Sequence, residues 1–177
     1  MTDGAFVAAL VKAAGGRLVG RVRLQKIAYL LQQVGLEEVR DLEWSYHHYG
    51  PYSEKLDEQL IFAKLFNLID EKRRPRSSDG ALYSIFELGQ GAKKKVPELP
   101  ENGRHLVQRL RDEDSIILEL AATAHWLSEK EQIADWREEL HRRKTWKVED
   151  GRLEKALELL KDLGLPPVAE AQAATTR

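Results

Sequence analysis

The chain has 177 residues, of which 42% are hydrophobic and 32% are charged, and its formal net charge is −1. This length and composition predict one soluble globular domain with a substantial core, and they exclude a disordered chain. The small net charge provides no overall attraction to nucleic acid or to an anionic membrane, so any such contact must come from a local patch. The absence of cysteine excludes disulfides, thiolate catalysis and cysteine-based zinc sites.

No apolar run approaches the length of a membrane span, and the first residues lack the basic region and apolar core of a signal peptide. We therefore expect a cytoplasmic protein that makes no contact with a membrane.

The N-terminal half mixes helical and strand-like patterns. Apolar residues recur at helical spacing in two early segments, and a glycine follows each of them. Trp44, Tyr46 and His48 alternate with other residues as they do in a strand, and Gly50-Pro51 then breaks the chain before Ser53, a good helix cap. The predicted elements are helices at 6–11, 24–34 and 53–67 and strands at 43–49, 68–75 and 81–88.

The helix predicted to begin at Ser53 has apolar residues on most of its sides, including Ile61 and Leu65, so we expect it to be well buried. The two strands that follow it are joined by a segment containing Asp79-Gly80, a strong hairpin signal. Helices, a corner, another helix and then a hairpin form an order that is typical of a winged helix-turn-helix.

The second half has helical patterns throughout, after a predicted hinge at Pro97 and Pro100. Ile116 to Leu127 is apolar nearly all round, which predicts the central buried helix of the fold. The fold class is therefore predicted to be α+β and mostly helical, with a winged-helix-like N-terminal half that carries a β-hairpin and a helical C-terminal half. We expect a single domain at 1–165, made of halves at 1–92 and 101–165, and a flexible tail at 166–177.

No pattern in the sequence indicates catalysis. There is no phosphate-binding glycine loop and no nucleophile elbow. His47 and His48 are neighbours on a predicted strand and would point to opposite faces, so they are poorly placed to share a metal ion. The sequence thus predicts no metal, no cofactor and no enzymatic activity, with an enzyme as the least supported class.

Nucleic-acid binding is the second class of function to weigh. The turn that would enter the major groove of DNA carries Glu54, Asp57 and Glu58, which would repel phosphate. Positive charge is grouped elsewhere, and we expect weak, salt-dependent contacts there, although a basic hairpin tip is also a common solvated turn. The candidate nucleic-acid-binding residues are Arg21, Arg23, Arg73, Arg74 and Arg76.

Protein binding is the third class. Tyrosines and histidines gather around the Gly50-Pro51 turn, and aromatic residues are enriched in binding hot spots. The alternative is that these aromatics belong to the core, which is favoured for Trp44 and Tyr46. The candidate partner-binding residues are Lys26, Tyr29, His47, Tyr49, Gly50, Pro51 and Tyr52.

Three segments carry a family resemblance, namely Leu24 to Leu31, His48 to Ser53 and Leu118 to Leu127. In this order they resemble the YwgA-type proteins over roughly Gly20 to Gly164. More remotely, the early Leu-Gln-Lys helix and the Gly-Pro corner are similar to the Panacea or SocA-like antitoxin domain. The resemblance implies a protein that binds and neutralises or adapts a protein partner, such as a toxin or a component of phage defence.

The sequence therefore predicts a non-enzymatic, antitoxin-like module that binds a protein partner. The alternative function is a winged-helix regulator that binds nucleic acid.

Overall fold

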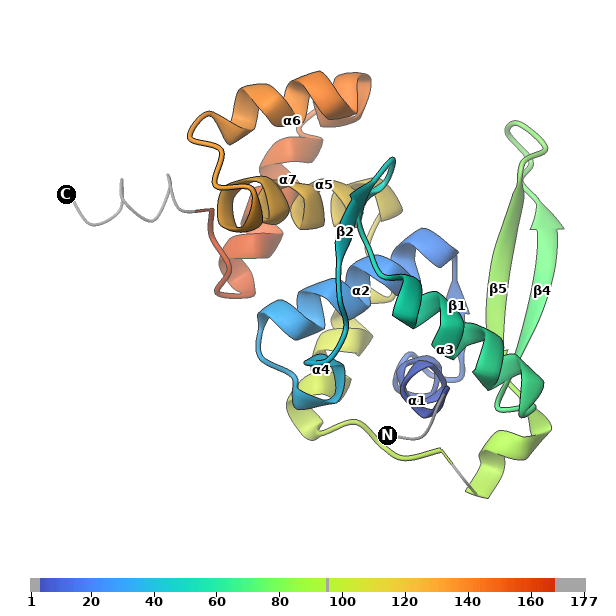
Figure 1. Ribbon diagram of the computed structural model, residues 1–177. Coiled ribbons are helices and arrows are strands. Elements are labelled where there is room, and N and C mark those ends of the chain that lie inside the picture. The colour runs from blue at the N-terminus through green and yellow to red at the C-terminus, as the bar shows by residue number, and fades with distance from the viewer. Residues whose placement is uncertain (1–3, 95, 168–177) are drawn as a thin grey trace.

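The computed structural model describes residues 4–94 and 96–167. It is an α+β fold made mostly of helices, as predicted (Figure 1). The N-terminal half contains α1 (Ala5–Ala13), β1 (Arg17–Val19), α2 (Arg21–Gln33), η1 (Glu37–Val39), β2 (Ser45–His47), β3 (Gly50–Tyr52), α3 (Glu54–Leu65), β4 (Ile69–Pro75), β5 (Leu82–Leu88) and η2 (Gln90–Lys94). The C-terminal half contains α4 (Glu101–Leu110), α5 (Ser115–His125), η3 (Trp126–Lys130), α6 (Trp136–Lys144), η4 (Thr145–Val148) and α7 (Arg152–Asp162).

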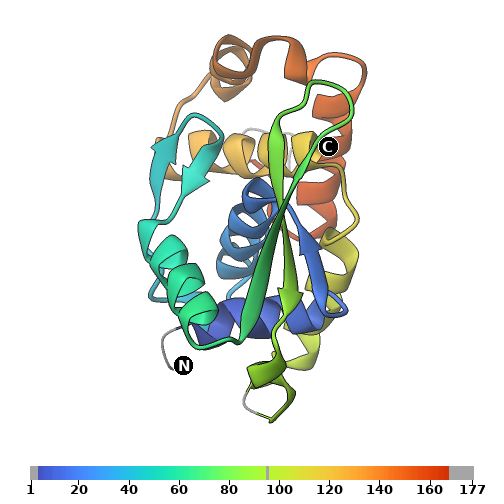
Figure 2. The same ribbon diagram turned by 90° about the vertical axis from the view of Figure 1, so that its right-hand side faces the viewer.

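The N-terminal half has the connectivity of a winged helix. Its main sheet is antiparallel with strand order β1-β5-β4, and Figure 2 shows these three strands side by side in front of the helices. Leu18 of β1 pairs with Phe86 of β5, and both side chains are buried in the core. The long hairpin of β4 and β5, called the wing below, extends away from the body of the molecule (Figure 1).

Strand β1 is absent from the elements predicted by the sequence. It is three residues long, too short for an alternation of apolar and polar residues to stand out. It exists because β5, far along the chain, offers it a free edge. A pairing of this kind is a tertiary contact that local pattern does not reveal.

Helix α3 occupies the predicted place and Ser53 caps it, its side chain accepting a hydrogen bond from the backbone N–H of Leu56. The prediction that this helix is well buried is wrong. Ile61 is 59% exposed and Leu65 is 68% exposed, because the helix lies on the outside of the molecule, along the left side of Figure 2. Only one stripe of it, formed by Leu56, Leu60 and Ala63, is buried.

The predicted corner is a second hairpin. The sequence predicts one strand over 43–49, but the strand is the shorter β2, and Gly50 to Tyr52 pair back on it as β3. Gly50 has φ +85°, a left-handed conformation that closes the short loop after His48 and Tyr49 and that glycine adopts without strain. The unit formed by β2, its loop and β3 is called the corner hairpin below.

The helical half is built around α5. Its residues from Ile117 to His125 are all buried, which confirms the predicted central helix. It packs against α2 and the corner hairpin, which belong to the N-terminal half, and against α6 and α7 of the helical half. One continuous cluster of buried apolar residues runs through both halves. Positions 168–177 of the predicted tail lie outside the described residues, and the single-domain assignment stays a prediction.

Among the helices of residues 4–94 and 96–167, none combines the length and apolar character required to cross a membrane.

Candidate functional site

The corner hairpin is fastened to α2 by a buried lysine. Lys26 is 1% exposed, and its Nζ donates a hydrogen bond of 2.6 Å to the carbonyl oxygen of Pro51. Burial lowers the pKa of Lys26 to about 7, an effect that nearby Glu119 opposes. The amino group therefore anchors the hairpin from inside the protein.

The helical half holds the same hairpin through a second buried lysine. The Nζ of Lys144 donates to the carbonyl oxygen of His48 at 3.0 Å and to Glu119 Oε1 at 2.9 Å. Lys147 donates to both oxygens of Glu119, each at 2.8 Å. Burial lowers the pKa of Lys144, and Glu119 counteracts part of this shift. One buried carboxylate thus organises the cations that fix the corner hairpin.

Tyr29 and His125 form a further buried contact between α2 and α5. The Tyr29 hydroxyl lies 2.9 Å from His125 Nδ1, and the two rings meet edge to face. Burial lowers the pKa of His125 to about 4 and raises the pKa of the Tyr29 phenol. The imidazole is therefore neutral at pH 7, as expected for a hydrogen-bonded core histidine.

Gly50 lets the corner hairpin approach α5 closely. A Cβ atom at this position would lie 2.5 Å from Thr123 Oγ1, a distance too short for two unbonded atoms. The left-handed φ and this close approach together explain why glycine occupies the loop.

Several predicted partner-binding residues are inaccessible. Lys26 and Tyr29 are buried, as are Gly50 and Pro51, so the prediction that Lys26 and Tyr29 lie on a surface beside the corner is wrong. The physical reason is that the backbone carbonyls of the hairpin that face the core need hydrogen-bond donors, and buried lysines supply them.

The remaining predicted residues of the corner reach solvent. Tyr52 is half-buried and donates a hydrogen bond of 2.7 Å to Asp57 Oδ2, and His47 stacks on its ring at 4.5 Å between centroids. Tyr49 is 49% exposed. The helical half supplies a neighbour of Tyr49, because Lys147 Nζ lies 5.0 Å from the Tyr49 ring centroid. The sequence did not reveal this contact, since the two residues are far apart in the chain. The run of basic residues at 141–144, which precedes Lys147, was the signal that the sequence offered for these cations.

The predicted nucleic-acid-binding arginines fall into two groups. Arg21 donates to Glu71 and lies 3.6 Å from Asp57, and Arg23 donates to two backbone carbonyls, those of Val19 and Glu113. Both are occupied within the fold. Burial alone would raise the pKa of Glu71, but hydrogen bonds from Lys64, Ser84 and Arg21 lower it to about 2.

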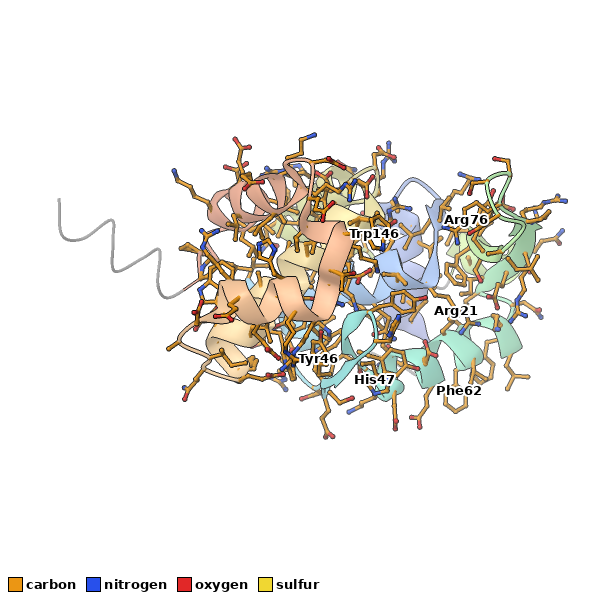
Figure 3. All side chains as sticks on the ribbon, turned by 90° about the horizontal axis from the view of Figure 1, so that it is seen from above. Arg21, Tyr46, His47, Phe62, Arg76 and Trp146 are labelled. Atoms are coloured by element: carbon orange, nitrogen blue, oxygen red, sulfur yellow. The ribbon has the colours of Figure 1, made fainter. Side chains whose placement is uncertain are left out.

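The wing arginines are open to solvent. The side chains of Arg73 and Arg76 are 62% and 57% exposed, and Arg74 is exposed as well. Arg73 lies 3.9 Å from Glu71, and Arg76 forms an exposed ion pair of 3.2 Å with Asp79, a kind of pair that contributes little to stability. Figure 3 shows Arg76 at the wing and Arg21 on the body of the protein.

An open hollow of about 490 Å³ lies between the chain before β2 and the start of α3. Three carboxylates and one lysine line it, so its charge disfavours phosphate. Its lining residues are Glu43, Trp44, Ser45, Glu54, Lys55 and Glu58. Within the part of the chain that the structure describes, no three His, Cys, Asp or Glu side chains are grouped to hold a metal ion.

Comparison with known proteins gives one informative similarity. The chain is 28% identical over 153 residues to a DNA ADP-ribosyl glycohydrolase from Thermus aquaticus, across 78% of this chain and 40% of that protein. The chain thus spans about 40% of the length of the curated relative that it matches. No family model matches the chain, and the resemblance to YwgA-type proteins stays a prediction.

This similarity corrects the predicted function. The relative has the name of an enzyme that hydrolyses a glycosidic bond, which contradicts both the expectation of a non-enzymatic, antitoxin-like module and the expectation that no enzyme is involved. The alternative of a winged-helix regulator is contradicted for the same reason. The predictions were wrong because they depended on finding a short catalytic motif. The similarity to an enzyme is instead an identity of 28% over 153 residues.

Proposed function

We propose that this chain acts in the removal of ADP-ribose from DNA, as part of a DNA ADP-ribosyl glycohydrolase, and that it engages the modified DNA. The observation that carries the proposal is the similarity to the Thermus aquaticus protein over 78% of the chain. Because the match covers 40% of that relative, the part assigned to this chain is the engagement of substrate, which any such hydrolase requires.

The charges of the winged-helix half support an unusual way of holding DNA. In a winged helix the first turn of the recognition helix approaches the bases and phosphates. Here that turn carries Glu54 and Asp57, and the exposed Glu58 follows it, so its charge repels phosphate. The approach through α3 is therefore electrostatically disfavoured.

The wing offers the favourable alternative. Arg73, Arg74 and Arg76 extend into solvent at its outer end, and guanidinium groups bind phosphate oxygens in a bidentate manner. Contacts of this kind hold the DNA backbone without reading its sequence. That property suits a protein whose target is defined by an attached ADP-ribose.

The test uses the full chain and two oligonucleotides of one sequence, of which one carries a single ADP-ribosylated base. Fluorescence anisotropy gives the affinity for each, and liquid chromatography follows free ADP-ribose. Tighter binding of the modified strand supports substrate engagement. Release of ADP-ribose in proportion to the chain would show that the hydrolytic centre lies within it as well. Equal affinity for both strands without release would overturn the proposal.

A further inference from the structure

Large apolar side chains are exposed on one face of α3 and at its C-terminal end. Ile61 and Leu65 lie largely in solvent, and Phe66 is 57% exposed. Phe62, at 38%, lies beside them, and its ring stacks on that of Phe66 with 6.4 Å between the centroids. Figure 3 shows Phe62 on the outer side of the molecule. These four residues are called the α3 patch below.

The α3 patch is contiguous, which separates it from scattered apolar residues on a surface. Among residues 4–94 and 96–167, seven large apolar side chains are exposed, and four of them form this patch. Residues four positions apart are neighbours on a helix. With about half of each side chain in water, the patch has an area on the order of 400 Å². Contiguous apolar surfaces of this size on soluble proteins are often binding sites.

The sequence of α3 is typical of a helix that is covered on two sides. Leu56, Leu60 and Ala63 face the core of the chain, while the α3 patch faces away from it. A helix with apolar residues on most of its sides is normally buried. The fold of one chain covers only one side of α3, so the patch calls for a second surface.

The charges next to the α3 patch disfavour nucleic acid and an anionic membrane as its occupant. Glu54 and Glu58 are exposed on the same helix, before the patch, and with Glu43 they line the open hollow. Their negative charge repels phosphate and anionic lipid. The occupant is therefore expected to be an apolar protein surface.

A second copy of α3 fits the patch in shape. Ile61 with Leu65 and Phe62 with Phe66 form two rows of residues four positions apart. Packed helices commonly fit such rows into the spaces between the rows of the neighbouring helix, at a crossing angle of about 50°. Because a two-fold interface uses the same surface on both copies, one patch supplies both the rows and the spaces between them.

Charge also favours the second copy. A two-fold axis perpendicular to α3 makes the two helices antiparallel, so Glu54 and Glu58 of one copy lie at the opposite end of the interface from those of the other. The acids of each copy stay near the N-terminal end of their own helix, where the helix dipole favours negative charge.

The size of the patch sets the strength of the contact. Two patches, each on the order of 400 Å², bury an area at the low end of the range for specific interfaces. The contact is therefore expected to be weak, with a dissociation constant in the micromolar range.

We propose that the α3 patch is the contact surface of a two-fold dimer of this chain. The inference goes beyond the proposed function and does not depend on it. The wing extends away from the body of the molecule (Figure 1), so each copy keeps its wing arginines in solvent. A dimer would present two wings to DNA, which raises the affinity for a strand long enough to reach both.

The experiment is sedimentation velocity of the full chain over a series of concentrations that spans the micromolar range. The unaltered chain is expected to show an equilibrium between monomer and dimer. Leu65→Gln places a polar side chain in the patch and is expected to weaken the dimer about tenfold. Its thermal melt should stay close to that of the unaltered chain, because Leu65 is exposed in the monomer and glutamine is a good helix former.

Leu82→Gln is the matched control, since Leu82 is 65% exposed and lies on the wing, outside the patch. It is expected to leave the dimer unchanged. A chain that stays monomeric at every concentration would overturn the proposal, as would an equal weakening of the dimer by the two substitutions.

Affinity for DNA separates this proposal from the proposed function. A dimer that depends on Leu65, in a chain with no preference for ADP-ribosylated DNA, would support the dimer and refute the proposed function. A monomeric chain in which Leu65→Gln lowers the affinity for DNA would place the patch in the DNA interface and refute the dimer.

Discussion

The corner hairpin and the wing are both antiparallel hairpins with charged residues around them. The cations of the corner are buried within the fold, whereas those of the wing are exposed to solvent. At the corner, Lys26 and Lys144 are buried and donate to backbone carbonyls of the hairpin. On the wing, Arg73 and Arg76 remain largely in solvent, and the ion pair of Arg76 with Asp79 is exposed as well. Burial, rather than the number of charges, separates a cation that holds the fold from one that is free to bind a ligand.

The largest effect should follow from removing the shared carboxylate of the corner. Glu119→Gln leaves buried Lys144 without its anionic partner, and breaking a buried ion pair in this way costs about 3–5 kcal/mol of unfolding free energy. Urea denaturation measures the loss. Glu87→Gln, which removes the acidic partner of Lys72 on the wing, is the matched control and should leave the unfolding free energy close to that of the unaltered protein. Similar losses in both variants would refute the contrast between the hairpins.

The pH dependence of stability should reveal the buried lysine of the corner. Lys26 has a pKa of about 7 in the folded protein, against an ordinary value of 10.5, so between these values the unfolded chain binds a proton that the folded state has lost. The unfolding free energy contributed by Lys26 therefore rises with pH through this window, by about 2 kcal/mol from pH 7 to pH 9.

Lys26→Met removes the titrating group and keeps most of the packing. Urea denaturation at several pH values should show that the stability difference between the unaltered protein and this variant shifts toward the unaltered protein as pH rises from 7. Parallel stability profiles for the two proteins would contradict the assignment of Lys26.

A smaller loss is expected where the anchor is a neutral hydrogen bond. Tyr29→Phe removes the hydroxyl that lies against His125 Nδ1 and leaves a buried ring nitrogen unpaired, at a cost of about 1–2 kcal/mol. Tyr49→Phe alters a tyrosine that is 49% exposed and serves as the control, with an expected change near zero. Thermal melts compare the two, and an equal response would show that burial does not decide the outcome.

The fold could be predicted to a large extent because its signals are local. The helical period of α2 and α5, the cap at Ser53 and the Asp79-Gly80 turn each depend on residues close in sequence. The pairing of β1 with β5 and the exposure of Ile61 depend on what else packs nearby, which a local pattern does not contain.

The candidate site was harder to predict for the same reason. In the sequence, Lys26 and Lys144 cannot be distinguished from lysines on the surface of a helix. Only the fold shows that both donate hydrogen bonds to backbone carbonyls of the corner hairpin. Tyr49 was identified from its local aromatic neighbours. Lys147 was not identified as a neighbour of Tyr49, since the two residues belong to different halves of the chain.

The smallest effect on stability should come from the wing. Replacing Arg73, Arg74 and Arg76 by glutamine removes exposed charges, so the unfolding free energy is expected to change by less than about 0.5 kcal/mol per residue. Affinity for DNA should fall, and the slope of log affinity against log salt should decrease by about one for each phosphate that the protein no longer neutralises. An unchanged slope would exclude the wing from the DNA interface.

Hydrogen–deuterium exchange of the full chain with an ADP-ribosylated oligonucleotide is the most direct test of where and what the protein binds. We expect slower exchange in the wing, residues 72–83, with a weaker effect from the unmodified strand. Protection confined to α3, or equal protection by both strands, would contradict the proposed engagement of ADP-ribosylated DNA through the wing.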